Sequence, residues 1–171
     1  MLPGAAAART LQFGAIKIPL SQSFLVSRLS FGLVNLKPIR PGHVLVVSRR
    51  RVARFNELSS DEVADLFLQG QRVSKVIERL YKADSMTLCI QDGKEAGQTV
   101  PHVHLHIIPR NKGDFDSNDE IYDELDGRMP PAPQRGQRGM DNDERDPRSA
   151  EDMASEAEVL RKEFGTWNEG L

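Results

Sequence analysis

Short apolar runs separated by turn-forming residues occupy much of the chain, and this pattern predicts β-strands. Residues 24–26 and 31–34 are mostly β-branched, aromatic or other apolar side chains. Residues 44–47 form another apolar run after a turn that contains proline and glycine. Residues 86–90 and 103–108 have the same character, so we expect strands in all five ranges.

From residue 59 onward the apolar residues recur at intervals of three and four, as on the buried face of a helix. This stripe consists of Val63, Leu66, Phe67, Gly70, Val73, Ile77 and Leu80. Ser59 and Glu62 form a capping box at its start. A second stripe, which ends at Gly165, consists of Ala150, Met153, Ala157, Leu160 and Phe164. Strands and two helices without regular βαβ alternation predict an α+β domain with an antiparallel sheet.

The composition along the 171 residues divides a single domain from less ordered segments. We expect residues 1–12 to be a flexible tail and residues 13–126 to form the domain. Residues 127–148 contain four prolines, three glycines and no aromatic residue, which predicts a mobile linker. Residues 149–165 are expected to form a C-terminal helix that packs on the domain.

Charge and cysteine content narrow the function classes. The first 56 residues contain nine Lys or Arg and no acid, although the net charge of the whole chain is −2. Such a basic half can attract phosphates, but a solvated basic surface is the commoner explanation. The arginine run at 49–51 is short and has no interleaved aromatic residues, so no nucleic-acid partner is expected. The single cysteine, Cys89, excludes an internal disulfide framework and a cysteine-built zinc site.

The apolar runs are too short to cross a membrane, which takes about 20 residues. No membrane association is therefore expected, and the expected location is the cytoplasm, with the nucleus or mitochondrion as alternatives.

The four histidines are the most informative residues: His43, His102, His104 and His106. The last three alternate with apolar residues, so a strand would direct them to one face over about 13 Å. Two such histidines can share a zinc ion, although a third ligand would have to come from elsewhere. A neutral imidazole can instead attack phosphorus and form a phosphoramidate. The spacing supports zinc and nucleophile equally, and both better than a merely polar face.

The segment HVHLHII matches the signature of the histidine triad superfamily, and the chain resembles that superfamily there. It resembles the fragile-histidine-triad branch, the diadenosine polyphosphate hydrolases, in three blocks: LSFGLVNLKPIRPGHVLV, IQDGKEAGQTVPHVHLHIIPR and GDFDSNDEIYDEL. The resemblance covers residues 13–125 and resumes over 148–164. It implies a histidine-triad fold with a five-stranded antiparallel sheet and two helices. It also implies a homodimer that extends the sheet across both subunits.

The resemblance also implies roles for individual residues. His104 corresponds to the nucleophile, which forms a nucleotidyl-histidine that water then hydrolyses. His106 corresponds to a histidine that contacts phosphate, whereas His43 and His102 correspond to supporting histidines. Asn35 corresponds to a residue that contacts the nucleoside. The loop that contacts substrate corresponds to Gln91, Gly97, Gln98, Thr99 and Val100.

The expected function is therefore a hydrolase that cleaves dinucleoside polyphosphates of the diadenosine triphosphate (Ap3A) type to AMP and the remaining nucleotide. A nucleoside phosphoramidase of the same superfamily is the first alternative. A nucleotide-binding signalling protein with slow turnover, with Tyr122 as its candidate phosphorylation site, is the second, and a zinc-binding protein without activity is the third. A divalent cation, Mg²⁺ or Mn²⁺, is expected to arrive with the polyphosphate, because no carboxylate cluster near the triad offers a tight metal site.

Overall fold

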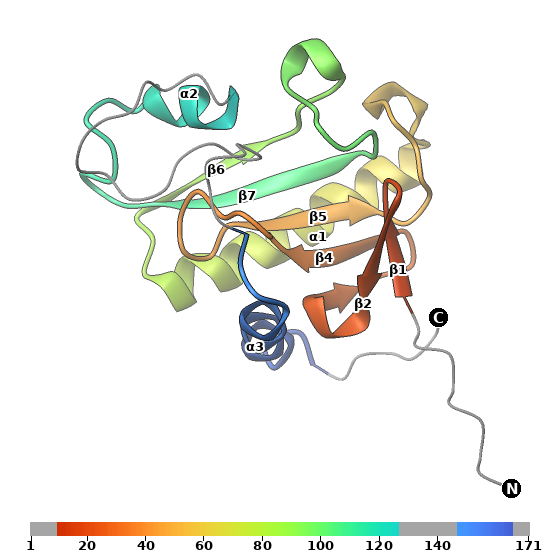
Figure 1. Cartoon of the computed structure of the whole chain (residues 1–171), viewed down its shortest axis with the longest axis horizontal. Helices are drawn as coiled ribbons and strands as arrows, with labels where there is room; N and C mark the ends of the chain where they lie inside the picture. The colour runs from red at the N-terminus through yellow and green to blue at the C-terminus, as the bar shows by residue number, and fades with distance from the viewer. Residues whose placement is uncertain (1–9, 127–146, 166–171) are drawn as a thin grey trace, which may run out of the picture.

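The computed structural model describes residues 10–126 and 147–165. Its centre is a five-stranded antiparallel sheet in the order β3-β4-β5-β7-β6, with a separate two-stranded hairpin beside it (Figure 1). The hairpin consists of β1 (Thr10–Phe13) and β2 (Ile16–Pro19). The strands of the sheet are β3 (Ser23–Val26), β4 (Ser30–Val34), β5 (Val44–Ser48), β6 (Ser85–Cys89) and β7 (His104–Arg110). The expected α+β class and antiparallel sheet are confirmed.

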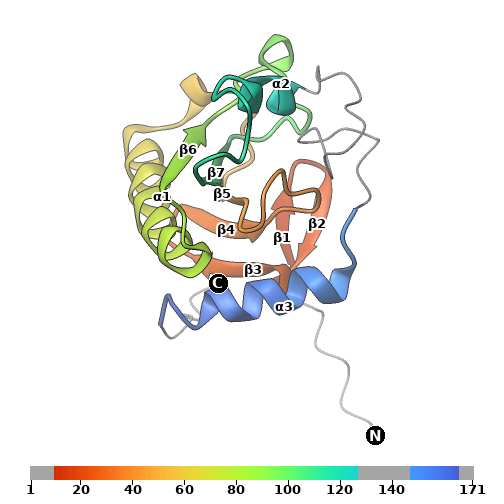
Figure 2. The same cartoon turned by 90° about the vertical axis from the view of Figure 1, so that its left-hand side faces the viewer.

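The two faces of the sheet have different coverings. Helix α1 lies on one side, and the β1–β2 hairpin lies on the other (Figure 2). Leu105 and Ile107 of β7 belong to the core between the sheet and α1. Because side chains alternate along a strand, His104 and His106 point to the opposite face, toward the hairpin. The side chains of β7 that form the core therefore lie on one face of the sheet, and its two histidines lie on the other.

Helix α1 (Ser60–Tyr81) begins at the capping box that the sequence predicted. Ser59 accepts a hydrogen bond from the backbone N–H of Glu62, whose carboxylate accepts one from the N–H of Ser59. A Cβ atom on Gly70 would lie 2.5 Å from Leu105 Cδ2. The glycine therefore allows the helix to pack closely on β7.

Helix α3 (Ala150–Arg161) runs beside β3 at one edge of the sheet (Figure 2). Its cap is Ser149, whose hydroxyl accepts a hydrogen bond from the N–H of Asp152. Met153 and Leu160 are buried on the side that faces the domain. The N-terminal end of α3 lies close to the hairpin, which brings the C-terminal part of the chain to the face that carries the histidines.

The expectation of two helices is wrong, because the described residues contain three. The additional helix, α2 (Glu120–Asp126), lies in a strongly acidic segment for which we expected no helix. Ile121 and Leu125 are one helical turn apart, and both are buried against Ile39 and Ile108. Two apolar anchors are enough to fix this short helix, and the surrounding acids obscured them in the sequence.

The expected tail of residues 1–12 is too long. Residues 10–12 belong to β1 and pair with β2 in antiparallel register, Thr10 opposite Pro19 and Gln12 opposite Lys17. This pairing gives the backbone N–H and C=O groups of these residues hydrogen-bond partners within the protein, whereas those of a solvated tail would bond to water. Residues 1–9 lie outside the described residues.

The expected linker of residues 127–148 also ends too late. The backbone N–H of Arg148 donates to Leu36 O at 3.1 Å, so this residue is part of the folded domain. Residues 127–146 lie outside the described residues. In the two described ranges, no helix is both long enough and apolar enough to cross a membrane.

Candidate active site

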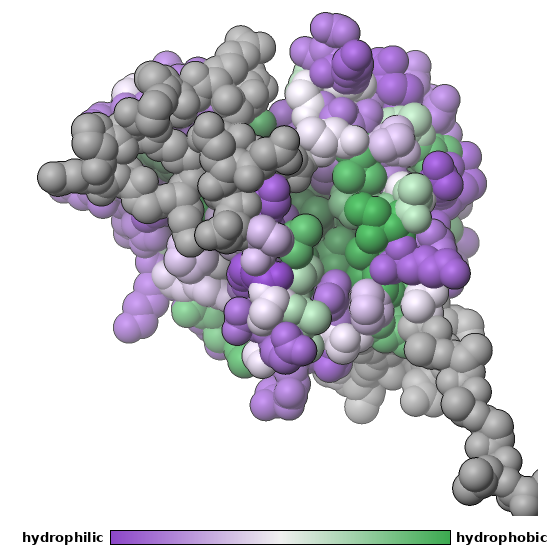
Figure 3. All heavy atoms as spheres, viewed as in Figure 1, coloured by the Kyte–Doolittle hydropathy of each residue, from purple (hydrophilic) through white to green (hydrophobic). Residues whose placement is uncertain are grey.

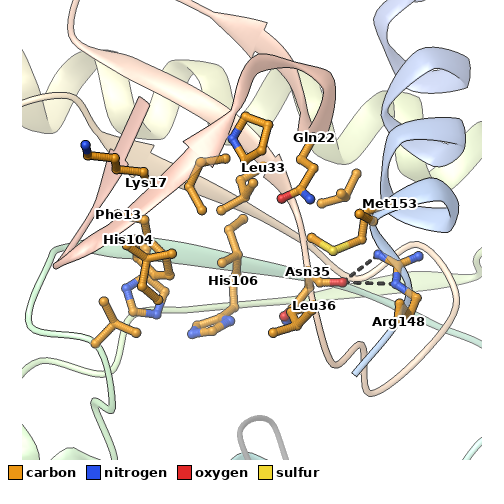
Figure 4. Close-up of a pocket in the computed structure, with 17 residues that line it drawn as sticks. Phe13, Lys17, Gln22, Leu33, Asn35, Leu36, His104, His106, Arg148 and Met153 are labelled. Carbon is orange, nitrogen blue, oxygen red and sulfur yellow. Dashed lines mark hydrogen bonds between the residues drawn. The ribbon is translucent and has the colours of Figure 1, made fainter. Parts of the chain in front are cut away.

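A cavity of about 370 Å³ opens between the hairpin, the histidine face of the sheet and the start of α3. Figure 3 shows a hollowed and largely hydrophobic area on this side of the molecule. The apolar lining comprises Phe13, Ile16, Ile18, Pro19, Leu33, Val34, Leu36, Leu45, Val100, Ala150 and Met153. The polar lining comprises Lys17, Gln22, Asn35, His104, His106 and Arg148 (Figure 4). A mostly apolar cavity of this size with a few convergent polar groups is typical of a small-molecule site.

His104 is held in a single tautomer. Its Nδ1 lies 2.7 Å from the carbonyl oxygen of His102, which can only accept, so Nδ1 carries the proton and donates. The lone pair is therefore on Nε2. The ring is buried and packs edge-on against Phe13, with 5.0 Å between the ring centroids. An imidazole held in this way has an unprotonated nitrogen on a ring that lines the cavity.

His106 is oriented by His43. The backbone N–H of Ile39 donates to His43 Nδ1 at 3.1 Å, so the proton of His43 is on Nε2. That nitrogen lies 3.2 Å from His106 Nδ1, which accepts. His106 Nε2 then carries a proton, and this buried atom has no hydrogen-bond partner among the described residues. His106 thus presents a donor to whatever occupies the cavity.

Burial keeps His106 neutral. It lowers the pKa of the ring well below its ordinary value of 6.5, because the charged form loses its hydration. His104 and His43 lower the pKa further, since a positive charge beside them is unfavourable. His106 therefore acts as a neutral hydrogen-bond donor at neutral pH.

His102 lies in the bend before β7, which begins only at His104, and it joins the hairpin to the sheet. Its Nδ1 accepts from the N–H of Gly14 at 3.0 Å, and its Nε2 donates to Ser48 O at 2.7 Å. Burial lowers the pKa of this ring too. Gly14, with φ +59°, is required at the turn of the hairpin, because a Cβ there would also lie 2.6 Å from Val100 Cγ1.

Only Val100 of the expected substrate loop lines the cavity. Gln98 holds its own loop: its Oε1 accepts from the N–H of Gly93 at 3.0 Å, and its Nε2 donates to Ala53 O at 2.9 Å. Gly97 follows the 3-10 turn η3 (Lys94–Ala96) with φ +82°. The side-chain amide of Gln98 therefore stabilises the loop that carries it.

The other two residues of that loop also lie outside the cavity lining. Gln91 is buried, and its Nε2 donates to Leu125 O at 3.4 Å, which joins the loop to α2. Thr99 is exposed. Tyr122, the candidate phosphorylation site, is also exposed, on α2.

Two charged residues of the lining escaped the sequence reasoning. Lys17 is brought to the cavity by the β1–β2 pairing, and Arg148 by the docking of α3. In the sequence, Arg148 stands out only as a cationic residue directly before Ser149, the start of the expected helix. In the structure it contacts the backbone carbonyl of Asn35 in the cavity wall, and a backbone group leaves no signature in the sequence.

The described residues contain no cluster of three His, Cys, Asp or Glu side chains arranged to hold a metal ion. The ring nitrogens Nδ1 of His104 and His106 both take part in hydrogen bonds within the protein. The arrangement instead places an unprotonated ring nitrogen beside a neutral donor, with 4.6 Å between the two ring centroids. This geometry is suited to nucleophilic attack on a centre whose oxygens need hydrogen-bond donors, such as phosphorus.

Comparison with known proteins agrees with this geometry. The HIT domain family matches residues 20–113. The bifunctional bis(5'-adenosyl)-triphosphatase/adenylylsulfatase FHIT of Arabidopsis thaliana is 49% identical over 152 residues, which is 89% of this chain and 83% of the relative. A bis(5'-adenosyl)-triphosphatase of Dictyostelium discoideum is 47% identical over 155 residues, with 91% and 93% covered. The solved structure of the Plasmodium falciparum diadenosine triphosphate hydrolase superposes with a TM-score of 0.69 at 29% identity, covering 92% of this chain and 85% of that one. The chain belongs to the HIT domain family, in its fragile-histidine-triad branch.

Proposed function

We propose that the protein hydrolyses dinucleoside polyphosphates of the diadenosine triphosphate type to AMP and the remaining nucleotide, through a covalent intermediate on His104. The observation that carries this proposal is the hydrogen bond from His104 Nδ1 to the carbonyl of His102, which leaves the lone pair on Nε2 of a cavity-lining ring. The activities named for the relatives at 47% and 49% identity support the same substrate class.

The reaction takes two steps. His104 Nε2 attacks the α-phosphorus, an N–P bond forms, and the bridging P–O bond breaks with its electron pair leaving on the departing nucleotide. Water then attacks the same phosphorus, the electron pair of the N–P bond returns to Nε2, and a water proton is released. The ring is positively charged in the intermediate, and the carbonyl of His102 stabilises that charge at Nδ1.

Other residues of the site bind and orient the substrate. The Nε2–H of His106 donates to an oxygen of the phosphate chain, because no protein group competes for it among the described residues. The apolar cavity wall holds one nucleoside, and Asn35 meets the ribose hydroxyls at its far end (Figure 4). The loop of Gln91, Gly97, Gln98, Thr99 and Val100 borders the path of the polyphosphate. Mg²⁺ or Mn²⁺ enters bound to that polyphosphate as part of the substrate.

The proposed homodimer joins two sheets at β6. Among the described strands, β6 pairs with β7 alone and forms an edge of the sheet, and its Leu88 is 48% exposed. An exposed edge strand offers unpaired backbone groups to a second strand. Pairing with β6 of a second copy would satisfy those groups and cover Leu88.

The test is a product analysis. Diadenosine triphosphate should yield AMP and ADP, faster than adenosine 5'-phosphoramidate yields AMP; the reverse preference would identify a phosphoramidase. Rapid quenching with labelled substrate should trap an acid-labile adduct on His104. The same assay with EDTA should lose activity that added Mg²⁺ restores, and full activity in EDTA would contradict the proposed cation.

His104→Asn should lower turnover by at least about a thousandfold while the dissociation constant of AMP stays within about threefold, because only the transition-state interaction is lost. Leu68→Ala, on an exposed part of α1 outside the cavity lining, is the control for nonspecific effects of substitution. Near-normal turnover of His104→Asn, or an adduct on another residue, would contradict the assignment.

A further inference from the structure

Arg148 extends from the residue before the cap of α3 back into the cavity wall. Its Nε lies 3.1 Å and its Nη2 lies 2.5 Å from the backbone carbonyl oxygen of Asn35 (Figure 4). The backbone N–H of Arg148 donates to the carbonyl oxygen of Leu36, the residue that follows Asn35, at 3.1 Å. Side chain and backbone of Arg148 together hold the two residues at which the chain leaves β4.

The guanidinium is fixed from its other side. Arg148 Nη1 is 2.5 Å from Glu156 Oε2, and Glu156 Oε1 accepts from the hydroxyl of Tyr81 at 2.5 Å. The side chains of Arg148 and Glu156 are 23% and 14% exposed. The positive charge is thus neutralised by its own helix, so the guanidinium is committed to Asn35 and does not serve as a phosphate ligand.

Asn35 connects this group to the histidines. Its Nδ2 lies 3.1 Å and 3.3 Å from the two ring nitrogens of His43, and its Oδ1 accepts from the N–H of Lys37 at 3.3 Å. His43 in turn donates to His106. Asn35 therefore lies between the group around Arg148 and the ring of His43, whose Nε2–H donates to the histidine that faces the cavity.

We propose that Arg148 is a positioning residue of the nucleoside end of the site: by fixing the carbonyl of Asn35 it sets the Asn35 amide against the ribose. This inference rests on the proposed function, because it assigns a role within the same substrate pocket. With this role for Arg148, α3 contributes to substrate binding. With a purely structural role, Arg148 would only anchor α3 to the domain.

Arg161 of the same helix is the matched control. Its Nη2 donates to the carbonyls of Leu20, Ser21 and Ser23, none of which lines the cavity. Arg161→Ala therefore removes a guanidinium–carbonyl anchor of α3 without touching Asn35. Arg148→Ala should raise the KM for diadenosine triphosphate about tenfold and change kcat less than threefold, because the Asn35 carbonyl loses the charged hydrogen bonds that fix it and the ribose contact weakens. Arg161→Ala should lower Tm to a similar extent and leave KM unchanged.

Arg148→Lys should raise KM by an intermediate factor, because an ammonium cannot reproduce the two-pronged contact with the Asn35 carbonyl. The decisive comparison repeats Arg148→Ala in the Asn35→Ala background, where its effect on KM should shrink to less than twofold. A tenfold effect that persists in that background, or an equal effect of Arg161→Ala on KM, would overturn the inference alone. A wild-type protein that releases no AMP from diadenosine triphosphate would overturn the proposed function, and this inference with it.

Discussion

At the scale of single residues, the chemistry depends on which nitrogen of each imidazole carries a proton. A backbone carbonyl sets this for His104, and a backbone N–H followed by a second imidazole sets it for His106. In their neutral forms the two rings have opposite functions, because His104 offers an electron pair and His106 offers a proton. Protonation of His104 would remove this difference, because its Nε2 would then carry a proton instead of a lone pair.

The buried histidines make stability depend on pH. Burial lowers the pKa values of His106 and His102, whereas an unfolded histidine titrates near 6.5. Below about pH 6.5 the unfolded chain binds more protons than the folded one, so the free energy of unfolding falls as pH falls. Above that pH this contribution is fully present. His106 alone should account for a loss of about 1 kcal/mol between pH 7 and 5.5.

Urea unfolding at several pH values between 8 and 5.5 measures this loss. The His106→Asn variant lacks one of the two groups and should show a shallower dependence on pH. Equal slopes for the variant and the wild type would mean that His106 is not buried in its neutral form.

The sequence predicted the reactive residues better than the walls around them. The alternation correctly placed His104 and His106 on one face of a strand, because alternate strand residues share a face. The expectation that His102 belongs to the same strand is wrong, because β7 begins only at His104. Hydrogen bonds to backbone atoms, such as that from Arg148 to Asn35 O, could not be predicted, because any residue supplies a carbonyl. The same holds for Gln98, whose amide bonds to Ala53 O of a distant segment.

At the scale of elements, the β1–β2 hairpin forms one side of the cavity and is joined to the sheet by an apolar cluster. Leu11, Phe13 and Ile18 of the hairpin pack there with residues of β4 and β5. Phe13 packs against His102 and His104, and the N–H of Gly14 donates to His102. The position of the hairpin therefore determines both the nucleoside wall and the surroundings of the nucleophile.

Gly14→Ala tests this element. The change forces an alanine to φ +59° and places its Cβ 2.6 Å from Val100, so it should destabilise the protein by about 2–4 kcal/mol and weaken AMP binding. Gly113→Ala is the matched control, because Gly113 also has positive φ, +76°, but no atom lies within 4 Å of its added Cβ. It should cost only about 1 kcal/mol and leave AMP binding unchanged. Equal losses in urea unfolding would mean that the contact with Val100 is unimportant.

The prediction of secondary structure failed for α2, a helix that is stabilised by only a few apolar residues. The 22 residues of α1 carry a long apolar stripe and a capping box, which made that helix predictable. Helix α2 has seven residues and depends on Ile121 and Leu125, whose burial is set by Ile39 and Ile108 of other segments. A tertiary contact of this kind is not visible in the local sequence.

At the scale of the whole molecule, the two edges of the sheet differ. β3 is accompanied by α3 (Figure 2), whereas β6 pairs with no strand on its outer side among the described elements, and α2 packs near its end at Cys89. The unpaired edge is therefore the surface on which the proposed dimer depends.

Leu88→Lys should convert the dimer to a monomer, because it places two charges against each other at the joined edges. Leu68→Lys is the matched control, since Leu68 lies on α1 and is 59% exposed. Light scattering at micromolar concentration should give the dimer mass for the wild type and for Leu68→Lys, and half of it for Leu88→Lys. A wild-type monomer would contradict the proposed assembly.

The walls of the cavity have a consequence for how this protein can diversify. The HIT domain match at 20–113 contains all four histidines, but the hairpin residues before it and Arg148, Ala150 and Met153 after it complete the cavity. Part of the wall that selects the nucleoside is therefore encoded outside the segment that carries the four histidines. Substitutions in the two flanks can change which nucleoside fits without replacing a histidine, although Asn35 of the same wall lies inside the matched segment.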